Sequence, residues 1–109
     1  MRTYRRVKVA VGVYFFTVNL AERRGNDLLV RHVDALRDAF RRTRRDHPFA
    51  MDAVCVLPDH LHCIWRLPEG DADFANRWSL IKQRFSRAVP AGERVSASLF
   101  RKGEDRRLG

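Results

Sequence analysis

The sequence predicts an α+β fold of the ferredoxin-like (RRM-like) type, with an antiparallel sheet and two helices on one of its faces. Three observations predict it. Some stretches are rich in β-branched and aromatic residues, two others repeat apolar residues at helical spacing, and their order is strand, helix, strand, strand, helix. A chain of 109 residues that is 45% hydrophobic is long enough for one such domain and too short for two.

The first strand is expected at Val9–Leu20, where β-branched and aromatic residues follow one another closely. In the second half of this strand the side chains alternate between two faces of the sheet. The apolar face, which is expected to enter the core, consists of Tyr14, Phe16, Val18 and Leu20. The opposite face, which becomes polar toward its end, consists of Phe15, Thr17 and Asn19.

Two helices are expected, at Leu28–Arg45 and from Phe74 to about Val89. In each of them four apolar residues recur at steps of four, three and four, which places them on one stripe of the helix. The two stripes consist of Leu29, Val33, Leu36 and Phe40, and of Phe74, Trp78, Ile81 and Phe85. Asn26 or Asp27 can cap the start of the first helix, and Asp73 can cap the second.

A tight antiparallel hairpin is expected between the two helices, with strands at Phe49–Leu57 and His60–Leu67. Pro58-Asp59 has the residue types of a turn, because proline fixes the first corner and aspartate tolerates the second. The pairs that follow from a two-residue turn are Leu57 with His60 and Cys55 with His62.

Residues 95–100 (VSASLF) are the candidate for a short fourth strand, which would complete the ferredoxin-like unit. The surrounding segment, residues 93–109, is polar and weakly patterned, and we interpret it as a tail. The chain is therefore expected to form a single domain over residues 1–109, with its core at residues 9–92.

The charge of the chain indicates the class of its partner. Lys and Arg number 22 against 13 Asp and Glu, and the formal net charge is +9. A balance this basic favours a polyanionic partner, most often nucleic acid, with a membrane surface or an acidic protein as alternatives. Arg far outnumbers Lys, which suits phosphate recognition because the guanidinium forks match phosphate oxygens. A chain that is simply basic is the plainer interpretation, and the excess of Arg over Lys argues against it.

The sequence favours a cytoplasmic setting. The apolar stretches are too short to span a bilayer, and no small-residue cleavage site follows the basic N-terminus. Cys55 and Cys63 lack zinc-finger spacing and fall on opposite faces of the hairpin, so we expect reduced thiols rather than a disulfide. No membrane partner is expected.

The strongest candidates for chemistry are His60 and His62. The strand period places both side chains on one face, with Cα atoms about 6–7 Å apart, while Leu61 points toward the helices. Two imidazoles on one side of a sheet can share a divalent metal ion. On spacing alone, partial burial or cross-strand packing is the favoured explanation of two such histidines.

Two neighbours could complete a metal site. Asp59 and Cys55 are placed to act as ligands or as hydrogen-bond partners of the histidines. A zinc site formed by Cys55, His60 and His62 is an open alternative, although no fourth ligand is evident in the sequence.

Three segments together resemble a known family. The stretch from Leu57 to Trp65 (LPDHLHCIW) resembles the His-hydrophobic-His motif of the HUH single-tyrosine transposases, in particular their REP-associated branch. Tyr14–Leu20 (YFFTVNL) resembles the first strand of that family, and Trp78–Arg87 (WSLIKQRFSR) resembles its helix with a Trp…Ile-Lys…Phe-Ser pattern. The likeness covers roughly residues 10–108.

The resemblance implies a reaction. In the family, two histidines and a third polar ligand hold Mg²⁺ or Mn²⁺ at the scissile phosphate of single-stranded or hairpin DNA. A tyrosine hydroxyl attacks that phosphate and forms a 5′-phosphotyrosine link. Carried over residue by residue, the metal ligands would be His60 and His62. Some dimers of the family complete their sites in trans, so a homodimer is a candidate assembly.

The nucleophile is where this sequence departs from the family. Tyr4 lies in a basic N-terminal segment and Tyr14 lies in the set assigned to the core, so neither matches the position of the family's tyrosine. The segment Arg101–Gly109 resembles the stretch just before the helix that bears it. No catalytic residue is therefore assigned, and the chain is expected to be truncated before that helix and unable to cleave DNA.

The expected DNA contacts come from two elements. The family's strand order places Thr17 and Asn19 on the face of His60 and His62. On the second helix, the basic candidates for phosphate contacts are Lys82, Arg84 and Arg87. The alternative function is a non-catalytic, ferredoxin-like nucleic-acid-binding module whose histidines bind no metal. The resemblance implies a bacterial, cytoplasmic and nucleoid-associated protein.

Overall fold

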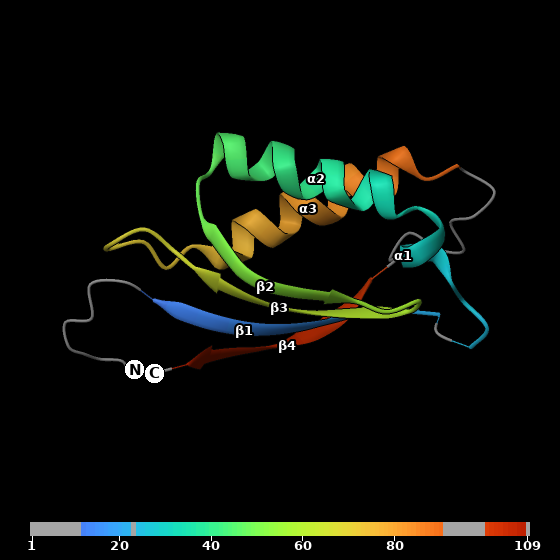
Figure 1. Ribbon diagram of the computed structural model, residues 1–109, viewed down its shortest axis with the longest axis horizontal. Helices are drawn as coiled ribbons and strands as arrows, with labels where there is room; N and C mark the ends of the chain where they lie inside the picture. Colours follow the sequence, from blue (N-terminus) through green and yellow to red (C-terminus); the bar gives the residue numbers. More distant parts are fainter. Residues whose placement is uncertain (1–11, 23, 91–99, 109) are drawn as a thin grey trace.

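The computed structural model describes residues 12–22, 24–90 and 100–108 of the chain. They form a sheet whose one face is covered by helices, as Figure 1 shows. The elements, in chain order, are β1 (Val13–Leu20), α1 (Leu28–Arg31), α2 (Val33–Asp46), β2 (Ala50–Val56), β3 (His60–Arg66), α3 (Phe74–Ala88) and β4 (Phe100–Leu108). This architecture confirms the predicted α+β, ferredoxin-like fold class.

The four strands lie in the order β2-β3-β1-β4, and each neighbouring pair is antiparallel. β1 and β2, which are connected through α2, are therefore not neighbours in the sheet. β3 lies between them, as the ferredoxin-like topology requires. The predicted two-residue turn is confirmed, since the Leu57 amide donates to the His60 carbonyl at 2.8 Å and Cys55 pairs with His62.

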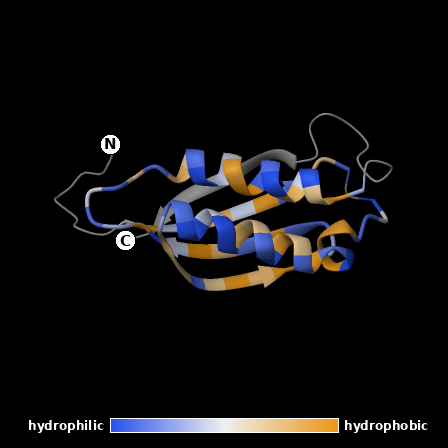
Figure 2. Cartoon of the chain, turned by 90° about the horizontal axis from the view of Figure 1, so that it is seen from above, coloured by the Kyte–Doolittle hydropathy of each residue, from blue (hydrophilic) through white to orange (hydrophobic). Residues whose placement is uncertain are grey.

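The core lies between the sheet and the helices. The alternation predicted for β1 is confirmed, because its even-numbered side chains from Tyr14 to Leu20 are buried and its odd-numbered ones are half-buried. Trp65 of β3 and Trp78 of α3 stack at the centre, with ring centroids 4.6 Å apart. Figure 2 shows the two long helices lying side by side above the strands.

The first predicted helix is broken in two at His32, where the backbone leaves helical geometry (φ −114°, ψ 38°). The apolar spacing fits one continuous helix, so the pattern could not reveal this break. The short α1 buries Leu28 and Leu29 completely, and the turn at His32 lets α2 bury Leu36 as well. Asn26 supplies the side-chain acceptor for the Leu28 amide at 3.0 Å.

The second predicted helix is confirmed as α3, which ends at Ala88, one residue before the expected end. The Asp73 carboxylate accepts a hydrogen bond from the Asn76 amide at 3.2 Å, as expected for a capping residue. Trp78, Ile81 and Phe85 of the predicted stripe are buried. None of the helices in the described part of the chain is long and apolar enough to cross a membrane.

The structure describes a fourth strand, most of which lies beyond the predicted range. It runs over Phe100–Leu108 and pairs with β1, whereas the sequence pointed to residues 95–100, of which 95–99 lie outside the described residues. The stretch interpreted as a tail thus contributes a strand to the sheet. Its sequence, FRKGEDRRL, is highly charged, which is common at a sheet edge but gives no apolar alternation to recognise.

The first strand is also shorter than expected. The structure begins β1 at Val13 rather than Val9, and residues 9–11 lie outside the described residues.

Candidate metal and nucleic-acid site

His60 and His62 lie on the face of the sheet that the helices leave open. Both are half-buried, while Leu61, Cys63 and Trp65 alternate with them and are buried beneath the helices. The predicted parity of β3 is therefore confirmed. The imidazole rings are close, with centroids 5.0 Å apart and planes at 85°. Because β3 is an inner strand, the pair lies at the end of a central strand and not on an edge strand.

Each histidine has a polar partner at Nδ1. The Asp59 carboxylate lies 2.7 Å from His60 Nδ1, and the two side chains are 23% and 22% exposed. The Thr17 hydroxyl, directly opposite on β1, lies 3.1 Å from His62 Nδ1. The two imidazoles are thus held by a turn residue and by a neighbouring strand.

The predicted placement of Thr17 and Asn19 on the histidine face is confirmed. In the register between β1 and β3, Thr17 is opposite His62 and Asn19 is opposite His60. Phe15, to which the sequence assigned no role, also lies here and stacks on His62, with ring centroids 5.8 Å apart and planes at 14°. The alternation of β1 was the signal that could have identified Phe15 as part of this site.

The structure does not bring the basic candidates of α3 together with the histidines, because α3 covers the opposite face of the sheet. The Arg84 guanidinium donates to the Thr43 hydroxyl and to the Asp46 carboxylate, each at 2.9 Å. Lys82 lies over the Trp78 ring, with Nζ 5.9 Å from its centroid, and Arg87 is exposed.

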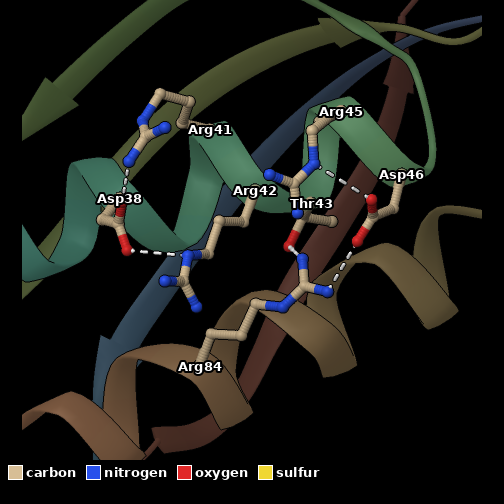
Figure 3. Close-up of polar contacts among 7 residues, drawn as sticks. All are labelled: Asp38, Arg41, Arg42, Thr43, Arg45, Asp46 and Arg84. Atoms are coloured by element: carbon tan, nitrogen blue, oxygen red, sulfur yellow. Dashed lines mark hydrogen bonds and ion pairs between the residues drawn. The ribbon is translucent and has the colours of Figure 1, made fainter.

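The arginines of α2 take part in a network of ion pairs, which Figure 3 shows. Asp38 pairs with Arg41 and Arg42, and Asp46 accepts from Arg45 as well as from Arg84. The hydrogen bond from Arg84, with that from Arg45, holds the pKa of Asp46 below its usual value. The positive charge of this layer is therefore partly compensated within the protein.

The donor set of the open face fits part of a metal site. Two neutral imidazoles can bind one divalent ion, and imidazole nitrogen suits first-row transition ions better than Mg²⁺, which prefers oxygen ligands. Of the two expected ions, Mn²⁺ is therefore the better match. Among the described residues, no three His, Cys, Asp or Glu side chains come together as a metal-binding group. The further ligand positions would be left to water, phosphate oxygens or other residues.

The zinc alternative gains no support from this geometry. Cys55 is opposite His62 in the register and exposed, yet it forms no three-residue ligand group with His60 and His62 in the described part of the chain.

Comparison with known proteins gives two curated relatives. A REP-associated tyrosine transposase of Escherichia coli is 50% identical over 88 residues, which are 81% of this chain and 53% of that protein. A Haemophilus influenzae protein of the same family name is 38% identical over 90 residues, or 83% of this chain and 51% of that protein. The chain therefore spans about half the length of these relatives. No protein-family model matches it.

Two solved structures share the fold. A REP-associated tyrosine transposase bound to a REP hairpin superposes with a TM-score of 0.81 at 41% identity, covering 100% of this chain and 63% of that one. A transposase structure from Deinococcus radiodurans gives a TM-score of 0.68 at 17% identity, covering 100% of this chain and 85% of that one. At this lower identity the likeness concerns the fold alone.

The sheet order, the two histidines on the open face and these similarities define the class of protein, an α+β transposase domain of the HUH type. Within that class, the chain belongs to the family of REP-associated tyrosine transposases. The family assignment made from the three sequence segments is confirmed.

Proposed function

We propose that this chain binds a divalent metal ion and hairpin or single-stranded DNA on the open face of its sheet, as the binding half of a transposase active site. The observation that carries this proposal is the pair of imidazoles, 5.0 Å apart between centroids, on the uncovered face of a domain with a net charge of +9. The similarity to a transposase bound to a REP hairpin supports DNA as the partner.

His60 and His62 would hold the ion, with Mn²⁺ preferred over Mg²⁺. When bound, the ion withdraws charge from a phosphate oxygen and fixes its orientation. Thr17 and Asn19 border the same place on β1 and are positioned to hydrogen-bond the DNA backbone beside it.

DNA cleavage would need a nucleophile that we do not assign in this chain. Tyr14 is only 5% exposed and packs against Phe16 and Phe74, and Tyr4 lies outside the described residues. We therefore propose that the chain binds hairpin DNA and forms no covalent adduct with it. Denaturing electrophoresis after incubation with labelled hairpin DNA and Mn²⁺ tests this, and a phosphotyrosyl adduct at Tyr4 or Tyr14 would contradict it.

Basic side chains of α3, on the helical face of the domain, would contact DNA phosphates. Arg84 is engaged with Thr43 and Asp46. The exposed Arg87 is therefore the better candidate for a phosphate contact, together with Lys82, which lies over the Trp78 ring. With DNA as the partner, the protein would act at the bacterial nucleoid, and a homodimer is a candidate assembly.

The alternative function, a nucleic-acid-binding module without metal, is favoured by one observation. Among residues 12–22 and 24–90, no third metal-binding side chain forms a ligand group with His60 and His62. Such a module would use the same open face, with His62 and Phe15 as a stacking surface for bases.

Titration calorimetry with Mn²⁺ separates the two functions. The wild-type chain is expected to bind Mn²⁺, and the His60→Ala/His62→Ala double variant is expected to lose this binding. His32→Ala/His47→Ala is the matched control, because it removes two imidazoles elsewhere in the chain. Equally weak uptake by the wild type and the first double variant would rule out the metal site and leave the binding module.

A further inference from the structure

We propose that Asp59 and Thr17 are positioning residues that fix the tautomers of His60 and His62, so that both imidazoles offer Nε2 to a metal ion. The inference rests on the proposed function, since it concerns how the same two histidines are prepared for the ion. It assigns a role to two side chains that would themselves bind no metal.

The tautomer of His60 follows from the chemistry of its partner. An ionised carboxylate can only accept hydrogen bonds, so the 2.7 Å contact requires His60 Nδ1 to carry the hydrogen and donate to Asp59. The lone pair of the neutral imidazole is then on Nε2. A carboxylate in this position fixes the tautomer and the orientation of a metal-binding imidazole.

The carboxylate is on a turn that is tied to the core. The Asp59 carbonyl accepts from the Leu20 amide at 3.0 Å, and the Pro58 carbonyl accepts from the Leu29 amide at 3.2 Å. Leu20 and Leu29 are both completely buried. The end of β1 and the start of α1 therefore fix the backbone of the turn, which keeps Asp59 beside His60.

His62 is held from two directions. The Thr17 hydroxyl lies 3.1 Å from Nδ1, and the Phe15 ring lies nearly parallel to the imidazole, with centroids 5.8 Å apart. A hydroxyl can either donate to a ring nitrogen or accept from it. In the proposed arrangement the hydroxyl accepts, so that His62 Nδ1–H donates to Thr17 and His62 Nε2 is the ligand atom.

The contacts of Asp59 with His60 and of Thr17 with His62 would both lower the free-energy cost of binding a metal ion. A neutral imidazole that lacks such a partner distributes between two tautomers and several ring orientations, and a metal ion must select one of them. Fixing the ring in advance removes that cost. Removing a partner of this kind typically lowers metal affinity about tenfold to a hundredfold.

The first experiment reads the tautomers in the metal-free protein. Long-range ¹H–¹⁵N correlation NMR at neutral pH distinguishes Nδ1–H from Nε2–H, and the expected result is Nδ1–H for both His60 and His62. Asp59→Ala is expected to give mixed tautomers at His60 alone, and Thr17→Val at His62 alone. An Nε2–H tautomer at either histidine of the wild type would overturn the role of its partner.

The second experiment measures Mn²⁺ affinity by calorimetry. Asp59→Asn and Asp59→Ala are expected to bind about tenfold or more weakly, and Thr17→Val less tightly than wild type, with recovery in Thr17→Ser, which restores the hydroxyl. Asp52→Asn is the matched control, because Asp52 pairs with Arg66 on the exposed surface. Unchanged affinity in both Asp59→Ala and Thr17→Val would overturn the proposal.

The two readouts keep this inference separate from the proposed function. If the wild type bound no Mn²⁺, the metal site itself would fail, whereas the NMR spectra would still decide whether Asp59 and Thr17 fix the rings. Melting temperatures of the variants show whether the fold is preserved.

Discussion

The two faces of the domain differ in the kind of polar side chain they carry. On the open face, the site consists of two imidazoles, a hydroxyl and the Asp59 carboxylate. On the helical face, arginines dominate, and many of them pair with aspartates of the same layer (Figure 3). A strongly basic composition therefore indicates a class of partner, but it does not indicate which face of the domain binds that partner.

The helical face itself contains two kinds of arginine. Arg77 is 4% exposed and donates to the His47, Pro48 and Asp73 carbonyls as well as to Asp71. Arg84 is more exposed and links α3 to α2 through Thr43 and Asp46. Arg84 is thus a partly exposed link between two helices, whereas Arg77 is buried.

The largest expected effect comes from removing the buried arginine. Arg77→Met should lower the free energy of unfolding by about 3 kcal/mol, because it leaves three backbone carbonyls and the Asp71 carboxylate without their buried donor. Arg84→Met, the matched control, should cost less than about 1 kcal/mol, as for a solvent-screened pair. Urea unfolding followed by tryptophan fluorescence measures both, and equal losses would erase the distinction between the two arginines.

DNA binding should respond differently to changes on the two faces. Lys82→Gln/Arg87→Gln should reduce the slope of log affinity against log salt by about 1–2, since each phosphate contact contributes about 0.9. Asn19→Ala, on the open face, should weaken binding about three- to tenfold with no change in slope, as for the loss of one neutral hydrogen bond.

A matched control separates phosphate contacts from overall charge. Arg37→Gln/Arg66→Gln removes the same net charge at two exposed arginines that pair with Asp34 and Asp52. Fluorescence anisotropy with a labelled hairpin at several salt concentrations gives the slopes. If this control changes the slope as much as Lys82→Gln/Arg87→Gln, only the net charge matters and the helical surface is not a specific contact.

The smallest expected effect is a pH dependence of stability on the helical side. The hydrogen bonds from the Arg77 side chain, and then from the Asp73 amide, hold the pKa of Asp71 below its usual value of 3.8. A carboxyl with a lowered folded-state pKa stabilises the protein above its unfolded pKa, and this contribution disappears as the pH falls through the folded value. The difference in the free energy of unfolding between wild type and Asp71→Asn should therefore be largest above about pH 5 and should decrease below about pH 4.

Thermal unfolding of both proteins between pH 3 and pH 7 measures this gap. The Asp52→Asn variant is a useful comparison, because the hydrogen bond from Arg66 also lowers the pKa of Asp52, on the exposed surface of the sheet. A gap for Asp71→Asn that stays constant across the whole range would show that the ion pair with Arg77 does not set the acid sensitivity.

Local patterns were sufficient for most of the fold. Alternation in β1, the two apolar stripes and the Pro58-Asp59 turn each describe contacts between residues close in sequence, so they could be read correctly. The break at His32 and the position of β4 could not. The first is a backbone turn that preserves apolar spacing, and the second is a charged edge strand, held by backbone hydrogen bonds to β1, that carries no such pattern.

The sequence by itself determined the family, the fold class and the placement of His60 and His62 on one face, because the motif and the strand period are local properties of the chain. Only the tertiary structure decided which of the neighbouring side chains contact those histidines, and at which atoms. It brought Thr17 to His62 across 45 positions of sequence and tied the Asp59 turn to β1 and α1. It also placed the basic side chains of α3 on the far side of the sheet, since strand order and helix packing depend on long-range contacts that no local pattern encodes.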